Sequence, residues 1–187
     1  MIALFLVLAC GGEGITAVEC ADGVDQDEDG SVDCAERVCE DFASCVNGAV
    51  PVLNEFMANN ANGHTDEDGE FEDWLELYNP SPAAVSLGGW SLSDDAAVPN
   101  RSELPDDLSV PASGFLVLFA DDEPVGDLHL LFKLAREGGT VVLSQDGVVV
   151  DRVSYPEQGT DVSLARTPDG GVDWVTTDAP TPGGKRE

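Results

Sequence analysis

The sequence predicts an all-β protein, a sandwich or a barrel, preceded by a small acidic segment that disulfides staple. From about residue 50 onward, short apolar runs alternate with turn residues, which is typical of sandwiches and barrels. No run has the length and period of a useful helix. The expected strands are 50–57, 74–78, 90–93, 115–120, 140–144, 148–155 and 162–166, with a closing strand at 172–175.

Two of these regions carry clear local signals. Gln145, Asp146 and Gly147 separate two β-branched runs, and an Asp-Gly pair supplies the positive backbone angles of a tight hairpin. In the strand 74–78, side chains alternate between the two faces, with Leu75 and Leu77 on one of them. Aromatic and acidic side chains share the other face, so we expect both faces of this strand to be partly covered.

The composition restricts the partners. The chain has 187 residues, enough for one ordinary domain and a small appendage, and 42% of them are hydrophobic, enough for a packed core. Thirty-seven Asp and Glu against 8 Lys and Arg give a formal net charge of −29. Such a charge repels phosphate backbones and anionic lipid surfaces. We therefore expect no nucleic-acid binding, and divalent cations are the natural partners.

The first ten residues read as an export signal. Residues 1–9 (MIALFLVLA) form an apolar run that is too short to span a bilayer but fits the core of a signal peptide. The stretch from Val7 to Cys10 resembles the lipobox of bacterial lipoproteins, in which the cysteine is lipidated and anchors the mature chain. No Lys or Arg precedes the run, which departs from that family. The alternatives are a buried strand or a cleaved signal with an incidental cysteine.

The remaining cysteines predict a disulfide-stapled segment after a short tether at residues 10–19. Without Cys10, an even number of cysteines is left, and all lie within residues 20–45. They are Cys20, Cys34, Cys39 and Cys45. Three pairings are open, and a zinc site is the disfavoured alternative because CxxC spacing and a nearby histidine are absent. Disulfides imply an oxidising compartment, in the cell envelope or outside the cell.

The cysteine segment also contains a loop of alternating oxygen donors around Gly30. Calcium takes six to eight oxygens, and a glycine at the sharp bend lets such a loop wrap one ion. The candidate ligands are Asp25, Asp27, Asp29, Ser31, Asp33 and Glu36. The segment resembles aspartate-rich, cysteine-flanked calcium-loop repeats akin to thrombospondin type 3. Ca²⁺ is therefore the expected cofactor, and a solvated acidic linker is the alternative.

From residue 53 to about 183 the chain resembles the lamin tail domain as it occurs in bacterial exported proteins. The motifs that carry the resemblance occur in order along the chain. They are NEFM at 54–57 with Asn59, DGE at 68–70, EDWLELYN at 72–79, LGGWSLSDD at 87–95, PASG at 111–114, FLVLFAD at 115–121, LH at 128–129, FKL at 132–134, DRVSY at 151–155, DVS at 161–163, RTPDG at 166–170 and TPG at 181–183. The resemblance implies an immunoglobulin-like β-sandwich at 50–183, after a linker at 46–49 and before a tail at 184–187.

Catalysis is not expected. The chain has no HExxH, GxSxG or GxxxxGK[ST] motif, and His64 and His129 are interpreted as surface or packing residues. Adjacent acids such as those at 94–95 and 121–122 usually sit at strand ends, facing water. A second calcium site would bring residues 66–70 together with Asp94, Asp95 or Asp161, but a solvated acidic loop is the favoured interpretation.

The sequence therefore predicts a non-catalytic lipoprotein of the cell envelope that acts in binding, adhesion or scaffolding. Its partner would be a protein or polysaccharide at the cell surface, and it would touch the membrane only through the lipid anchor. The alternative is an accessory or truncated component of an exported hydrolase or kinase-like system.

Overall fold

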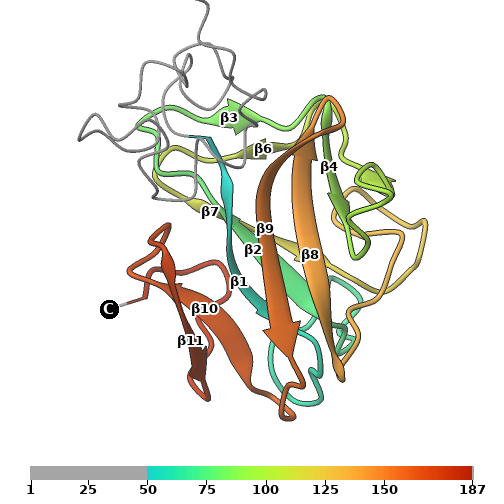
Figure 1. Cartoon of the computed structure of the whole chain (residues 1–187), viewed down its shortest axis with the longest axis vertical. Helices are drawn as coiled ribbons and strands as arrows, with labels where there is room; N and C mark the ends of the chain where they lie inside the picture. Colours follow the sequence, from blue (N-terminus) through green and yellow to red (C-terminus); the bar gives the residue numbers. More distant parts are fainter. Residues whose placement is uncertain (1–49, 187) are drawn as a thin grey trace, which may run out of the picture.

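The structure is a computed structural model that describes residues 50–186, and within this range it consists of eleven strands and no helix (Figure 1). The strands are β1 (Val52–Met57), β2 (Trp74–Tyr78), β3 (Val85–Ser86), β4 (Trp90–Ser93), β5 (Ser102–Glu103), β6 (Ser109–Val110), β7 (Phe115–Phe119), β8 (Gly138–Gln145), β9 (Val148–Pro156), β10 (Ser163–Thr167) and β11 (Asp173–Thr177). The prediction of an all-β fold is confirmed. Nothing in the described range forms a helix that is long and apolar enough to cross a bilayer.

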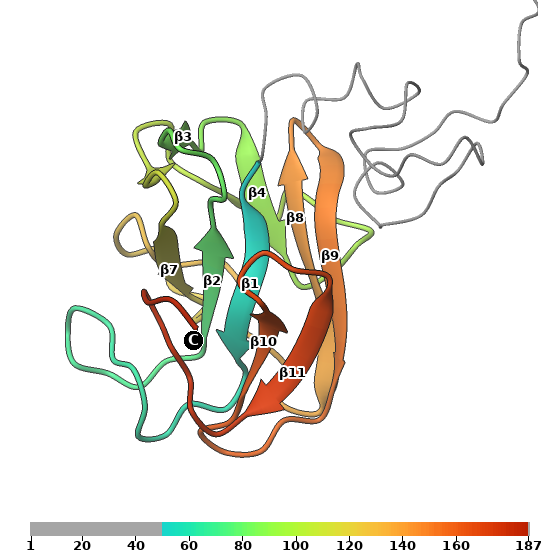
Figure 2. The same ribbon diagram turned by 90° about the vertical axis from the view of Figure 1, so that its left-hand side faces the viewer.

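Two antiparallel sheets face each other as the layers of a sandwich (Figure 2). The five-stranded sheet has the order β11-β10-β1-β2-β7, and the four-stranded sheet has the order β5-β4-β8-β9. A small third sheet pairs β3 with β6. Because β10 and β11 complete the sheet that β1 begins, the two ends of the described chain meet in one layer.

The core lies between the two large sheets. Leu75 and Leu77 of β2 point into it and are fully buried, as the alternation in the sequence predicts. Phe56 packs there edge-on against Tyr155 and Trp174, with ring centroids 4.9 and 5.8 Å apart. This aromatic cluster joins β1, β9 and β11, so the core ties both sheets together.

The β8–β9 hairpin confirms the turn that the sequence predicts. Strand β8 ends at Gln145 and β9 begins at Val148, leaving Asp146 and Gly147 as a two-residue loop. Their φ angles are 49° and 79°, which is the type I′ geometry that matches the twist of the strands. The hairpin is longer than expected because β8 begins at Gly138, where a Cβ would come within 2.7 Å of the Tyr155 carbonyl oxygen.

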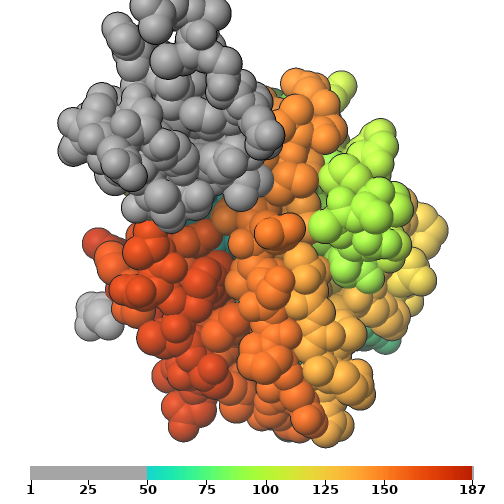
Figure 3. All heavy atoms as spheres, in the orientation of Figure 1, coloured from blue at the N-terminus to red at the C-terminus, as the bar shows by residue number. Residues whose placement is uncertain are grey.

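An ion pair closes the sandwich where β9 passes β10. The guanidinium of Arg166 donates to both carboxylate oxygens of Asp151, at 2.9 Å each, and to the carbonyl of Leu53 at 2.6 Å. Asp151 also accepts a bond from the Leu53 N–H at 2.8 Å. The surface view shows the β10–β11 region (red) directly beside β9 (orange) (Figure 3). These contacts link the layers at a point where neither sheet hydrogen-bonds to the other.

Every strand that the sequence predicts after residue 50 is present. The structure has three further short strands that the sequence does not predict. Strands β3, β5 and β6 have two residues each, so they carry no run long enough to show alternation. Their positions follow from pairing with neighbours, as when Ser102 of β5 opposes Leu92 of β4.

Candidate functional site

The outer face of the five-stranded sheet holds two buried carboxylates side by side. Glu55 of β1 and Glu76 of β2 are register partners, and their exposed fractions are 1% and 0%. A β-bulge between Leu53 and Glu55 shifts the register, so that Asn54 also lies on this face and donates to Glu76 at 2.8 Å. Directly opposed like charges destabilise a sheet unless donors surround them. Here four of the six donors come from the end of the described chain.

Glu55 is surrounded by four donors. Ser163 Oγ donates to Oε1 at 2.5 Å, and the N–H and hydroxyl of Thr181 donate to Oε2 at 3.0 and 2.8 Å. The guanidinium of Arg186 completes the set with a bond to Oε1 at 2.7 Å. A buried carboxylate is stable only with such partners, so residues 181 and 186 are what permit Glu55 to sit in the sheet.

Glu76 has fewer partners and no cation. Its Oε1 accepts from Asn54, and its Oε2 accepts from the N–H of Gly183 at 2.6 Å. Burial raises the pKa of Glu76 to about 7, and the two hydrogen bonds offset this only in part. Glu76 therefore changes its charge near neutral pH.

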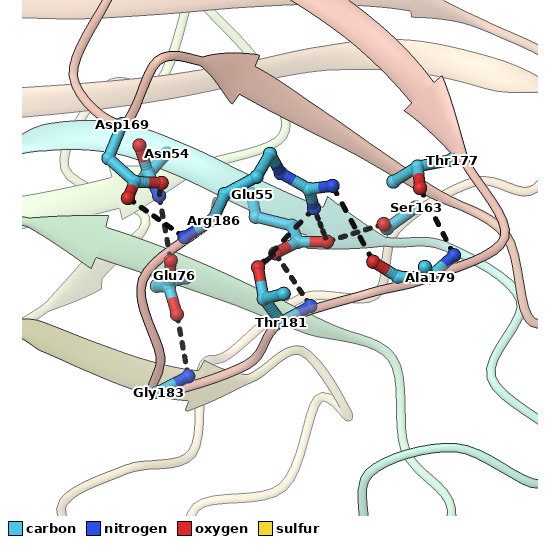
Figure 4. Close-up of polar contacts among 10 residues, drawn as sticks. All are labelled: Asn54, Glu55, Glu76, Ser163, Asp169, Thr177, Ala179, Thr181, Gly183 and Arg186. Carbon is cyan, nitrogen blue, oxygen red and sulfur yellow. Dashed lines mark hydrogen bonds and ion pairs between the residues drawn. The ribbon is translucent and has the colours of Figure 1, made fainter.

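Asn54 and Asp169 continue this network toward the turn that follows β10. The side-chain oxygen of Asn54 accepts from the N–H of Gly170 at 2.9 Å, and its amide donates to Asp169 at 3.1 Å. Asp169 in turn accepts from the N–H of Arg186 at 3.0 Å. Figure 4 shows these acceptors, with those of β1 and β2, facing the last described segment of the chain.

We call residues 178–186 the C-terminal strap. The backbone N–H groups of Ala179, Thr181 and Gly183 point to the sheet and donate to Thr177, Glu55 and Glu76, respectively. The alternate positions 180 and 182 are prolines, which have no N–H to leave unpaired. Pro182 and Gly183 then form the centre of a turn closed by the Gly184 N–H and the Thr181 carbonyl at 2.9 Å, with φ of 73° at Gly183.

A second polar cluster surrounds His129, which is not a surface residue. Its Nδ1 contacts Asp121 and its Nε2 lies 3.1 Å from Glu67, while the ring leans on Phe119 with centroids 5.7 Å apart. Burial lowers the pKa of His129, but hydrogen bonds and charge from both carboxylates outweigh this and raise it above the usual value. The histidine thus links the 58–73 loop to the end of β7. Its ring packs against Phe119, which agrees with the packing interpretation, and both of its ring nitrogens also contact carboxylates.

The acidic residues considered for a second calcium site do not come together. Asp66 accepts from the N–H groups of residues 68 and 70, both at 2.9 Å, within its own loop. Asp94 pairs with Arg101, and Asp161 binds the N–H groups of residues 61 and 62. Within residues 50–186, no group of three or more acidic, histidine or cysteine side chains is placed to hold a metal ion.

An open acidic groove lies beside Trp90 on the four-stranded sheet. Its volume is about 430 Å³, and Glu103, Asp106 and Asp146 line it together with Asn100. Trp90 itself is almost fully buried, so the groove offers polar and acidic groups rather than an aromatic platform. Such a surface suits a cationic or hydroxyl-rich partner.

The predicted lipidation, disulfide and calcium residues lie outside the described residues. These are Cys10, the four cysteines of 20–45 and the six candidate calcium ligands. The sequence did locate Asn54, Glu55 and Glu76 as motif residues, but not their role. The available signal was a charged residue, Glu76, in the middle of a strand whose two faces are both covered. Arg186 fell in the expected tail and gave no signal.

The two facing antiparallel sheets define an immunoglobulin-like β-sandwich. The sequence model of the Lamin Tail Domain family matches residues 47–157, more than half of the chain. The chain belongs to the lamin tail domain family. A comparison with curated proteins found none that matches this chain. The family match ends after β9, whereas β10, β11 and the strap complete the five-stranded sheet and its outer face.

Proposed function

We propose that this protein is a non-catalytic binding or scaffolding protein of the cell envelope, built on a lamin tail sandwich. The observation that supports this is that the buried carboxylates of the family motifs accept hydrogen bonds from their own chain. Glu55 and Glu76 bind backbone and side-chain donors of their own chain instead of lining an open cleft. Groups used in this way hold a surface in place, and a rigid sandwich with loops at its ends is a common platform for binding.

The attachment is proposed to run through Cys10. The short apolar run and the small residue before this cysteine support cleavage after residue 9 and lipidation of Cys10. Disulfides among Cys20, Cys34, Cys39 and Cys45 would then stiffen the segment between the anchor and the sandwich. The partner is proposed to be a protein or polysaccharide at the cell surface, because the net charge of −29 disfavours nucleic acid and anionic lipid.

Calcium is proposed to bind the loop that contains Asp25, Asp27, Asp29, Ser31, Asp33 and Glu36. The spacing of the oxygen donors supports this, and the high negative charge raises the local concentration of divalent cations. Isothermal titration of the full chain should show a Kd on the order of 10⁻⁴–10⁻³ M. Asp29→Asn should abolish the heat, whereas Asp68→Asn, in the exposed 66–70 loop, should leave it unchanged. Equal heats for the two variants would contradict the assignment.

Intact mass of the protein from native membranes tests the anchor. We expect loss of residues 1–9, added acyl mass on Cys10 and a mass gain on reduction and alkylation that corresponds to two disulfides. Cys10→Ala should release the protein from the membrane fraction. A full-length chain with five free thiols would contradict export, anchoring and disulfides together.

A binding assay tests the scaffolding function itself. Purified, labelled Cys10→Ala protein should bind isolated envelopes of the native host saturably, and unlabelled protein should compete. Protease treatment of the envelopes should remove the binding if the partner is a protein, and periodate oxidation should remove it if the partner is a polysaccharide. Absence of saturable binding to envelopes would contradict the proposal.

A further inference from the structure

The C-terminal strap lies against a set of hydrogen-bond acceptors as a peptide ligand lies against a receptor. We use the word groove for these acceptors alone, which are Glu55, Glu76 and Thr177 on the sheet face, with Asp169 beside them (Figure 4). The two central carboxylates are fully buried, but every strap residue is half-buried or exposed. The specificity therefore resides in the sheet, and the strap is a surface segment bound to it.

The acceptors match one kind of peptide. Three inward N–H groups at alternate positions fit an extended segment, and prolines between them leave no outward donor unsatisfied. A Pro-Gly turn follows, and it returns Arg186 so that its guanidinium reaches Glu55 while its N–H reaches Asp169. The groove thus accepts an extended, proline-spaced segment that ends in a turn and a basic residue.

The strap is held by polar contacts that another copy of the same segment would make equally well. Its contacts are with side-chain acceptors rather than with a backbone ladder, and Pro180 and Pro182 lower the entropy lost on binding. The connection at Asp178 joins it to β11, and no strap residue is a strand partner of the eleven described strands. Exchange of an identical element between copies needs no new complementarity.

We propose that the outer face of the five-stranded sheet is a peptide-binding site whose resident ligand is the C-terminal strap, and that the strap of a second copy of this chain can take its place. Such exchange links sandwiches to one another through their straps. The inference concerns this sheet alone and holds whether or not the chain is anchored in an envelope.

A peptide-binding experiment tests the groove. The full chain carrying Arg186→Ala has a weakened resident strap, so it should bind a fluorescent peptide of residues 178–187 about tenfold more tightly than the wild-type chain does. Adding Asp169→Ala should weaken this binding, whereas Asp173→Ala, at an exposed position on β11, should not. A peptide carrying Arg186→Glu should fail to bind.

Mixing two variants tests whether the strap exchanges between two copies of the chain. The Arg186→Ala chain has a weakened strap above an intact groove, and the Asp169→Ala chain has an intact strap above a weakened groove. Their mixture should form a heterodimer by native mass spectrometry, in excess over the homodimer of either variant. Near-ultraviolet circular dichroism confirms that both are folded. Failure of folded Arg186→Ala protein to bind the peptide, or equal binding of the Arg186→Glu peptide, overturns the site. Peptide binding without the heterodimer overturns exchange between copies.

Discussion

Raising the pH from 5 to 8 should destabilise the sandwich, chiefly through Glu76. The pKa of this buried side chain is about 7 in the folded protein, against 4.5 for an ordinary glutamate. A difference of 2.5 pKa units, at 1.36 kcal/mol each, is worth about 3 kcal/mol of unfolding free energy. Because the folded pKa is raised, this stability is fully present below pH 4.5 and is lost as the pH rises toward and through 7.

Three other groups act in the same direction. Burial raises the pKa of Asp73 to about 6 and also raises the pKa of Glu72, so their contributions are lost with rising pH, and the raised pKa of His129 adds a loss above its ordinary range. The carboxyls with lowered pKa values, Glu67 and Asp161, act in the opposite direction only below the ordinary pKa of a carboxyl. They therefore do not oppose the effect between pH 5 and 8.

Urea unfolding followed by tryptophan fluorescence measures this dependence. Wild-type protein should have a lower urea midpoint at pH 8 than at pH 5, with an unchanged slope. Glu76→Gln cannot ionise. Whatever its absolute stability, the difference in its unfolding free energy between pH 5 and pH 8 should therefore be smaller than that of the wild type by about 2–3 kcal/mol, because a small part of the effect is already lost at pH 5. Equal or higher wild-type stability at pH 8, or an undiminished difference in Glu76→Gln, would refute the assignment of the raised pKa to Glu76.

Three further predictions use the same unfolding assay. Phe56→Ala should cost about 3–5 kcal/mol because it empties the centre of the aromatic cluster, whereas Phe71→Ala, 47% exposed, should change little. Arg166→Ala should cost about 3–5 kcal/mol because it leaves Asp151 unpaired between the layers, whereas Arg136→Ala, from a surface ion pair, should cost less than about 1 kcal/mol. Gly147→Ala should cost about 1–2 kcal/mol because its φ of 79° is strained for any residue with a Cβ. Equal urea midpoints for Phe56→Ala and Phe71→Ala would contradict the argument from the aromatic cluster. Equal urea midpoints for Arg166→Ala and Arg136→Ala would contradict the argument from the ion pair.

Features that depend on local periodicity could be predicted from the sequence. The alternation in β2 and the Asp-Gly turn of the β8–β9 hairpin are each contained in a short stretch of sequence. The structure has both of them at the expected positions. The two-residue strands could not be predicted because their existence depends on what pairs with them. The calcium, disulfide and lipidation predictions lie outside the described residues and stay predictions.

The candidate site could be predicted only in part, for a physical reason. Glu55 and Glu76 are recognisable as motif residues, but a buried carboxylate is explained by its donors. Most of these donors lie more than 100 positions away, among them Thr181, Gly183 and Arg186. Nothing in the period of a strand indicates a partner so distant in sequence. The function of such a residue becomes clear only when the topology brings β1, β2 and the strap together.

Two segments lie over the outer face of the five-stranded sheet, the 58–73 loop and the C-terminal strap. They make different kinds of contact, and this difference decides which of them can detach. At one end, Met57, Trp74 and Phe119 form an apolar cluster, and His64 of the 58–73 loop stacks on Phe119 with centroids 5.8 Å apart. Lifting that cover would expose large apolar groups to water, which opposes release. In the middle of the sheet the strap covers carboxylates, and water can hydrate a carboxylate that loses its donors. The polar cover is therefore the one that can exchange, while the apolar cover keeps the sandwich closed.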